Sequence, residues 1–323
     1  GTRGRAPFDS ILSHGFVVDG KGLKMSKSLG NVIAPEDILK KYGADILRIW
    51  VASSNYSEDL RIDYSILDQH ADSYRKIRNT FRYLLGNLND NFEINNFEEI
   101  DVNELPELEQ YVLHRLYCLN NNFKKYFRNY DFHNLYKELL NFCTVDLSAF
   151  YFDIRKDTLY CDPKNSTKRR STIILLNIIL NCLLKWFAPI LSFTTEEIYR
   201  LIFKDSKSIH LEKFLEFPEK FQNESLNNKW LELIKIRDIC NISIEEKRAS
   251  KEIGSSLEAE LKININQKFK ELTKNIDFSE LCITSQANVD YSDKDTTVLT
   301  SKAKGIKCPV CWKISESPCP RHS

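Results

Sequence analysis

Regular apolar spacing along the middle of the chain is the feature that most constrains its fold. From about residue 64 to residue 203, apolar side chains recur every three or four positions, which is the spacing of one face of an α-helix. Four such runs cover residues 67–88, 108–126, 132–151 and 173–187. Thr194 and Glu197 form a capping-box pattern that predicts a fifth, shorter helix. The sequence therefore predicts an α-helical bundle.

The N-terminal part follows a different pattern, in which short apolar runs alternate with glycines. Residues 10–18 predict a strand that ends at the turn signal Asp19-Gly20. A helix is predicted to begin at Pro35, with acidic residues in its first turn, and to stop at Gly43. Strand, turn and helix together indicate an α/β segment.

The C-terminal part changes from helical to strand spacing. Another helix is predicted around Trp230. Strict alternation of apolar and polar residues over 257–266 then predicts a half-buried strand, and residues 282–284 and 297–299 are shorter strand candidates. The whole chain is thus predicted to be mainly α, with a small α+β region near its C-terminus.

The composition is that of a globular protein without polyelectrolyte character. Of 323 residues, 28% are charged and 42% hydrophobic, and the net charge is +1. Contact with nucleic acid would therefore need local basic patches, such as residues 168–170 or 75–82. Asn177 and Asn181 interrupt the most apolar stretch, so we expect no membrane span. Most of the nine cysteines are scattered over apolar stretches, which favours free thiols in a reducing compartment and a cytoplasmic location.

A short loop between glycines carries the first candidate chemistry. Its residues Lys24-Met25-Ser26-Lys27-Ser28 hold two ammonium groups and two hydroxyls. Such a loop suits a polyphosphate whose negative charge grows during a reaction. The sequence has no Walker-type loop and no Gly-x-Gly-x-x-Gly that would compete with it. By composition alone, a solvated turn is the more common interpretation of such a segment.

A cluster of soft metal ligands lies near the C-terminus. Cys308 and Cys311 form one close pair, and Cys319 and His322 form a second pair after seven intervening residues. Two such pairs can meet at one tetrahedral Zn²⁺, so the sequence predicts one zinc ion per chain. Incidental cysteines in a frayed terminus, or a disulfide, are the alternatives.

The loop and its surroundings resemble the end of the catalytic domain of class I aminoacyl-tRNA synthetases. The resemblance includes Gly30-Asn31, Pro35 and the string Lys41-Tyr42-Gly43-Ala44-Asp45 at fixed spacing. Within this class the chain is most similar to the isoleucyl-tRNA synthetases. The segments that carry this similarity are Leu29 and residues 47–54, 146–151, 156–157, 159–161, 253–259 and 308–322.

The resemblance implies the C-terminal portion of such an enzyme, divided into four parts. These are the end of a class I α/β nucleotide-binding fold at 1–62, a helical anticodon-binding domain at 63–222, an α+β junction at 223–300 and a zinc-binding knuckle at 301–323. The enzyme would be a monomer.

The reaction that the resemblance implies has two steps. Isoleucine attacks ATP, which enters with Mg²⁺, to give isoleucyl-adenylate and pyrophosphate, and the aminoacyl group then moves to an isoleucine tRNA. Lys27 would close on the departing pyrophosphate, with Lys24 as the second cation and Ser26 and Ser28 as hydrogen-bond donors. Met25 belongs to the same ATP-binding loop. The helical bundle would grip the anticodon arm of the tRNA.

Two features depart from the family pattern. The family's His-x-Gly-His element is absent, because no two of the six histidines lie within three residues of each other. We therefore expect the chain to be inactive in adenylate formation by itself. His322 stands where the family usually has a fourth cysteine. A non-catalytic zinc-containing RNA-binding module and a valyl or leucyl relative remain as alternatives.

Overall fold

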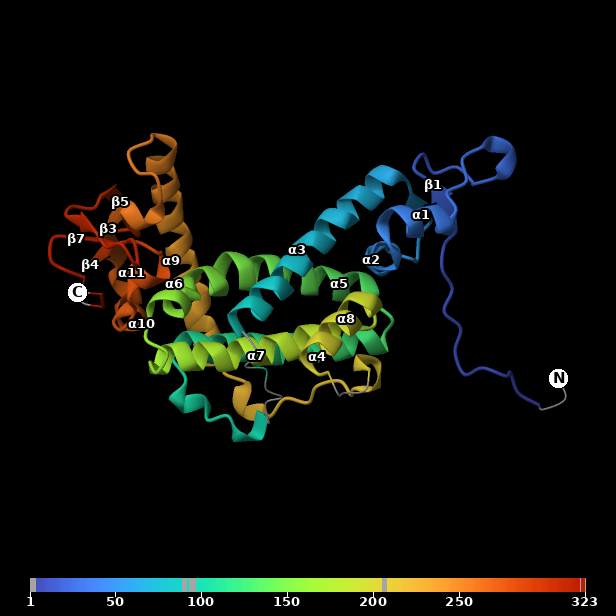
Figure 1. Cartoon of the computed structure of the whole chain (residues 1–323), viewed down its shortest axis with the longest axis horizontal. Coiled ribbons are helices and arrows are strands. Elements are labelled where there is room, and N and C mark those ends of the chain that lie inside the picture. The colour runs from blue at the N-terminus through green and yellow to red at the C-terminus, as the bar shows by residue number, and fades with distance from the viewer. Residues whose placement is uncertain (1–3, 89–91, 93–96, 205–207, 320, 323) are drawn as a thin grey trace. The chain divides into compact units, whose positions relative to one another are not determined.

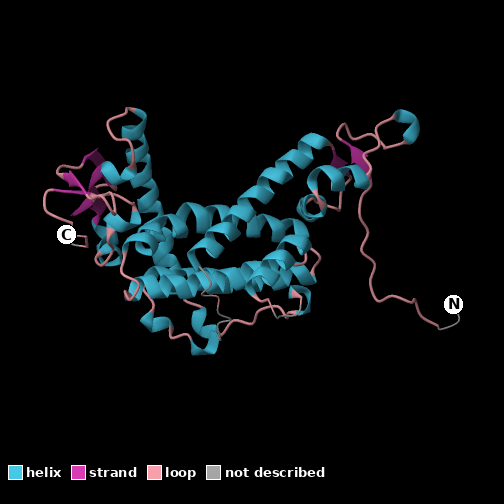
Figure 2. Cartoon of the chain, viewed as in Figure 1, coloured by secondary structure: helices cyan, strands magenta, loops and turns pink. Residues whose placement is uncertain are grey.

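Helices dominate the protein, and the strands gather in a few places (Figure 2). The computed structural model describes residues 4–88, 92, 97–204, 208–319 and 321–322, and Figure 1 follows its elements along the chain. The chain forms two compact units, one from residues 1–92, 119–144 and 180–216 and the other from the remainder. The predicted fold class, mainly α with small sheets, is confirmed, whereas the four domain boundaries stay a prediction.

The first unit contains a two-stranded parallel sheet and several helices. Its elements are β1 (Val17–Asp19), α1 (Pro35–Tyr42), α2 (Ala44–Ser53), β2 (Leu60–Ile62), α3 (Tyr64–Leu88), α5 (Phe132–Asn141) and α8 (Ser192–Ile202). Helix α1 begins and ends as predicted, since Pro35 occupies its first turn and Gly43 follows it with a φ of 86°. This left-handed backbone suits glycine and stops the helix.

A small core holds the N-terminal elements of this unit together. Ile38 of α1, Trp50 of α2, Ile62 of β2 and Leu67 of α3 form one buried cluster. The Trp50 ring also donates a hydrogen bond from Nε1 to the Arg61 carbonyl at 3.0 Å. Because Met25 packs against this cluster, the core also supports the loop that follows β1.

The predicted strand over residues 10–18 is wrong in its length. Only Val17–Asp19 is a strand. It pairs in register with β2, and Val18 also forms an isolated antiparallel bridge with Lys24. Ile11 is 76% exposed and Phe16 is 81% exposed. Gly15 and Phe16 form backbone hydrogen bonds with residues 56–60, but among the described residues no strand lies beside residues 10–14. A strand needs such a partner for its backbone groups.

The predicted capping box is also wrong. Helix α8 begins at Ser192, so Thr194 is already helical and does not cap it. The cap comes from Asp45 of α2, whose Oδ2 accepts hydrogen bonds from the Thr194 N–H at 2.8 Å and from its hydroxyl at 2.6 Å. A carboxylate satisfies free N–H groups at a helix start and opposes the positive end of the helix dipole.

The predicted helical run over 132–151 divides into two kinds of helix. After α5, the chain forms the π-helix η4 (Phe142–Phe152), and helix α6 (Asp153–Cys161) follows. The buried side chains of this segment include Phe142, Leu147, Tyr151 and Phe152, so it belongs to the interior although its backbone bonds from i to i+5.

Two long helices contribute residues to both units. They are α4 (Glu107–Arg128) and α7 (Thr167–Phe187). By length and composition alone α7 could cross a membrane, but 72% of its most apolar window is buried inside the protein. This burial is typical of a core helix.

The second unit ends in a mixed sheet that lies beside helix α9 (Glu224–Ala249), shown in orange in Figure 1. The central strand β3 (Ala259–Asn266) pairs parallel with β4 (Gln286–Ser292) and antiparallel with β5 (Thr297–Lys302). Its residues alternate between buried and less buried, as predicted from the sequence.

The strand predicted at 282–284 does not form. This segment instead follows α11 (Phe278–Leu281) as a turn in which Ile283 has a φ of 57°. The short helix α10 (Lys270–Thr273) precedes α11. The last elements of the chain are the strands β6 (Ile306–Lys307) and β7 (Ile314–Ser315), which form a hairpin.

Candidate functional site

The lysine and serine loop leaves strand β1 and is tied at its base by two side chains. Asp19 accepts hydrogen bonds at Oδ1 from the Lys21 and Leu23 N–H groups, at 3.0 and 2.8 Å. Its Oδ2 accepts a bond of 2.8 Å from the Asn31 side-chain amide. That amide is the main reason why the pKa of Asp19 lies below its ordinary value.

Asn31 also holds the two ends of the loop to each other. Its Nδ2 lies 3.2 Å from the Lys24 carbonyl, and its Oδ1 accepts from the Ser26 N–H at 2.9 Å. The short 3₁₀-helix η1 (Lys27–Leu29) follows and ends at Gly30, whose φ is 65°. The loop therefore has a defined backbone path although most of its residues are exposed.

The side chains of the loop point to different surroundings. Met25 packs on the core, and the Ser26 and Ser28 hydroxyls lie 3.1 Å apart. Lys24 and Lys27 are exposed, and neither takes part in an ion pair with a residue that the structure describes. The loop thus presents two ammonium groups and a pair of hydroxyls to solvent, a set that can bind an anion.

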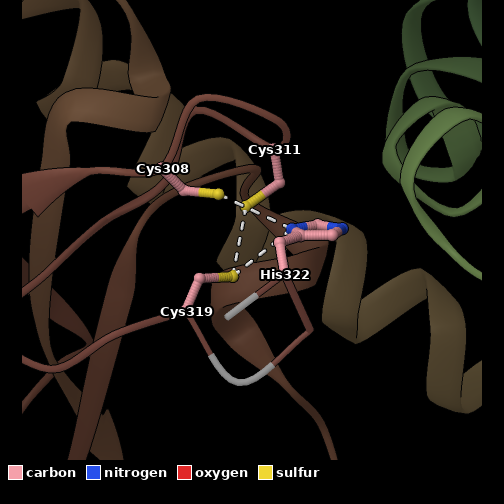
Figure 3. Close-up of side chains that lie close together, drawn as sticks. All are labelled: Cys308, Cys311, Cys319 and His322. Atoms are coloured by element: carbon pink, nitrogen blue, oxygen red, sulfur yellow. Dashed lines mark hydrogen bonds between the residues drawn. The ribbon is translucent and has the colours of Figure 1, made fainter.

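The predicted metal ligands come together at the C-terminus of the described chain (Figure 3). Donor atoms of Cys308, Cys311, Cys319 and His322 all lie within 4.8 Å of one another. The Cys311 and Cys319 sulfurs are 3.8 Å apart, and His322 Nδ1 lies 3.4 Å from the Cys319 sulfur and 3.6 Å from that of Cys308. A single ion at the centre of such a group would have four ligands, as in structural zinc sites.

The hairpin geometry brings the first two cysteines together. The Cys308 N–H donates a hydrogen bond to the Lys313 carbonyl at 2.9 Å, and the Trp312 N–H donates one to the Cys308 carbonyl at 3.0 Å. Trp312 has a φ of 63°, which closes the turn. N–H groups of Cys311 and Val310 lower the pKa of Cys308 to about 6. Three sulfurs and one imidazole form a donor set that fits Zn²⁺.

A second group of potential ligands does not fit a metal. His114, Cys118 and Glu224 have donor atoms within 4.8 Å of one another. However, His114 Nδ1 accepts a hydrogen bond of 3.0 Å from the Asn223 N–H. The neutral ring then carries its proton on Nε2, the nitrogen that faces Cys118 at 3.5 Å, and cannot donate a lone pair there.

The basic patches that the sequence suggested are engaged in part. Lys168 forms an ion pair with Glu280 at 2.8 Å, and Arg169 donates to the Asp162 carbonyl at 2.6 Å. Arg75 pairs with Asp72 at 2.6 Å on the surface of α3. These contacts occupy part of the charge that would otherwise face a phosphate.

Sequence patterns alone missed the residues that position both groups. Asp19 and Asn31 support the loop, and Asp157 and Asp162 bind Arg321 next to His322 at 2.6 and 2.8 Å. The Asp19-Gly20 and Gly30-Asn31 turn signals were the available hint for the first pair. No local signal marks the second pair, because it lies about 160 residues from its partner.

Two family models match the chain. The model for class I tRNA synthetases (I, L, M and V) matches residues 1–63, and the model for the anticodon-binding domain of tRNA ligase matches residues 109–263.

Similar curated proteins share one name. The isoleucine–tRNA ligase of Pelagibacter ubique (strain HTCC1062) is 75% identical over 324 residues, which cover 100% of this chain and 36% of that protein. The isoleucine–tRNA ligase of Agrobacterium fabrum (strain C58 / ATCC 33970) is 43% identical over 97% of this chain and 33% of that protein. The chain therefore spans about a third of the length of these relatives.

A solved structure supports the fold. The LeuRS of Agrobacterium radiobacter K84, in its ternary complex with tRNA and LeuAMS, has a TM-score of 0.51 and 18% identity, over 65% of this chain and 24% of that one. With the near-complete coverage by isoleucine–tRNA ligases and the two matched domains, the chain belongs to the isoleucyl-tRNA synthetase family of class I tRNA synthetases, of which it represents a portion.

Proposed function

We propose that this chain acts within a complete isoleucine–tRNA ligase, which joins isoleucine to its tRNA at the expense of ATP. The observation that carries the proposal is the loop of residues 24–28, which exposes two lysines on a fixed base in a chain 75% identical to a protein of that name. The valyl or leucyl alternative has less support, because both curated relatives described above are isoleucine–tRNA ligases.

The loop acts in the first step, the formation of isoleucyl-adenylate. ATP enters with Mg²⁺, and negative charge builds on the leaving pyrophosphate. Lys27 neutralises that charge, Lys24 adds a second positive charge, and the Ser26 and Ser28 hydroxyls donate hydrogen bonds. A group that stabilises charge only in the transition state contributes about 3–4 kcal/mol.

The helical part and the cysteine cluster act on the tRNA side. The region matched by the anticodon-binding model, residues 109–263, holds the anticodon arm of an isoleucine tRNA. Cys308, Cys311, Cys319 and His322 hold one structural Zn²⁺, which fixes a terminal segment that has little core of its own. The enzyme works as a monomer in the cytoplasm and has no membrane partner.

The test uses the complete enzyme that contains this chain. Lys27→Ala should slow isoleucine-dependent pyrophosphate exchange about 100- to 1,000-fold and leave the dissociation constant of isoleucine unchanged. Lys21→Ala is the matched control, since Lys21 is also exposed and lies three residues before the loop. An exchange rate that is equal in the two variants would contradict the role of the loop. Pyrophosphate exchange by residues 1–323 alone would contradict the expectation that the chain needs the rest of the enzyme.

A further inference from the structure

His322 presents its two ring nitrogens to two different environments. Nδ1 faces the sulfurs of Cys319 and Cys308, at 3.4 and 3.6 Å. Nε2 lies 3.1 Å from the carbonyl oxygen of Cys161. A carbonyl can only accept, so Nε2 must carry the proton, and Nδ1 keeps a free lone pair on the side of the Cys308 and Cys319 sulfurs. The ring is therefore already in the tautomer that coordinates through Nδ1.

The carbonyl that selects this tautomer belongs to the end of helix α6. Cys161 is the last residue of that helix, where backbone carbonyls lack partners within the helix. The Cys161 sulfur also lies 3.8 Å from the Val310 carbonyl, between the first two cysteines of the cluster. One helix end thus contacts both halves of the ligand set.

Arg321 makes a second attachment to the same helix end. Its Nη1 binds Asp157 at 2.6 Å and Asp162 at 2.8 Å. Asp157 lies one turn before Cys161, and Asp162 is the C-cap residue that directly follows α6. A cation is also favoured beside the negative end of a helix dipole. Two carboxylates and the dipole of α6 therefore all stabilise the guanidinium at this place.

We propose that the end of α6 positions the metal site: the Cys161 carbonyl orients His322 for coordination through Nδ1, and Asp157 and Asp162 hold Arg321 so that the ligand stays in place. The inference rests on the proposed zinc function and deepens it. Ligating histidines commonly donate their second N–H to a carbonyl or carboxylate, and loss of such outer partners weakens metal binding 10- to 100-fold. By reciprocity, zinc binding strengthens the attachment of Arg321 and His322 to the end of α6.

The affinity test uses the complete chain and zinc in competition with a coloured chelator. Asp157→Asn combined with Asp162→Asn should weaken zinc binding at least about tenfold, while one zinc per chain still binds at saturation. Asp238→Asn combined with Asp295→Asn is the matched control, because it removes two exposed carboxylates of the same unit that lie on α9 and in the turn before β5. An affinity equal to that of the control variant would overturn the inference.

A spectroscopic test makes its measurement on the unaltered chain and uses a variant only to assign the signal. In the chain loaded with ¹¹³Cd²⁺ and labelled with ¹⁵N-histidine, the cadmium coupling should appear on Nδ1 of His322, and Nε2 should keep its proton. The cadmium-coupled nitrogen signal is assigned to His322 if it is missing from the spectrum of His322→Cys. Coupling to Nε2 would overturn the inference and leave the zinc proposal standing, whereas a chain that binds no zinc or cadmium would contradict the zinc proposal itself.

Discussion

Asn31 donates a hydrogen bond from Nδ2 to Asp19 Oδ2 at 2.8 Å and so joins the end of strand β1 to the segment that follows the lysine and serine loop. The same side chain contacts the backbone of Lys24 and Ser26. One amide therefore sets the path of the loop at three points. Asn31 donates two hydrogen bonds, to Asp19 and to the Lys24 carbonyl, and accepts one from the Ser26 N–H. Because all three contacts lie at the base of the loop, we expect no direct role for Asn31 in charge neutralisation.

Asn31→Ala should therefore lower the rate without removing a charged group. A misplacement of about 1 Å in a catalytic group can cost on the order of 100-fold, so we expect pyrophosphate exchange by the complete enzyme to fall at least about tenfold. The dissociation constant of isoleucine should stay the same. Asn288→Ala, on strand β4, provides the control. A rate for Asn31→Ala that matches the control would show that the loop keeps its position without the amide.

The cap of helix α8 gives a stability prediction that separates two interpretations. Asp45→Ala removes the acceptor for the Thr194 N–H and hydroxyl, both of which are buried. We expect a loss of about 1–3 kcal/mol in the free energy of unfolding, measured by urea denaturation. Glu197→Ala, which would break the capping box suggested by the sequence, should cost less than about 0.5 kcal/mol because Glu197 is exposed. A larger loss of unfolding free energy for Glu197→Ala than for Asp45→Ala would support the capping box instead.

Several local signals in the sequence predicted local structure, although the capping box at Thr194 and Glu197 and the strand at 282–284 do not form. Pro35 and Gly43 fixed both ends of α1, and the alternation over 257–266 identified the buried face of β3. The spacing of the cysteines likewise anticipated the group around His322. In each case the residues that carry the signal are the residues that form the structure.

Contacts between distant segments were not predictable in the same way. Asp45 caps a helix that begins 147 residues later in the chain, at Ser192, and Arg321 binds a helix end about 160 residues earlier. Such pairs depend on how the helices pack, and neither apolar spacing nor turn residues encode that packing. The strand expected at 10–18 failed for the same reason, because strand formation requires a partner that its own sequence does not supply.

Removal of a single cysteine should release the metal. Cys308→Ser and Cys311→Ser each take away one of four donors, so we expect the zinc content of purified protein to fall from about one per chain to nearly none. Cys118→Ser should keep its zinc, because Cys118 is not a ligand: the neighbouring His114 accepts a hydrogen bond from the Asn223 N–H at Nδ1 and cannot bind a metal through Nε2. Elemental analysis of protein prepared without chelators measures the content. Full zinc content in both Cys308→Ser and Cys311→Ser would show that the zinc does not bind at these cysteines.

The buried ion pair of the second unit should be far more costly to break than its exposed neighbour. Glu109 is fully buried and accepts from Arg155 Nε at 2.6 Å, from Arg155 Nη2 at 2.7 Å and from the Tyr151 hydroxyl at 3.0 Å. Arg155→Ala leaves that carboxylate in the interior without its cation, which typically costs about 3–5 kcal/mol.

Lys168→Ala supplies the comparison within the same network. The Lys168 side chain is 41% exposed, and its partner Glu280 keeps the bond to Arg155 Nη1 at 2.6 Å. An exposed pair of this kind contributes at most about 1 kcal/mol. Urea unfolding of the two variants should therefore differ by at least about 2 kcal/mol. Equal losses would mean that water reaches Glu109 once the guanidinium is gone, so that the carboxylate is not stranded in an apolar interior.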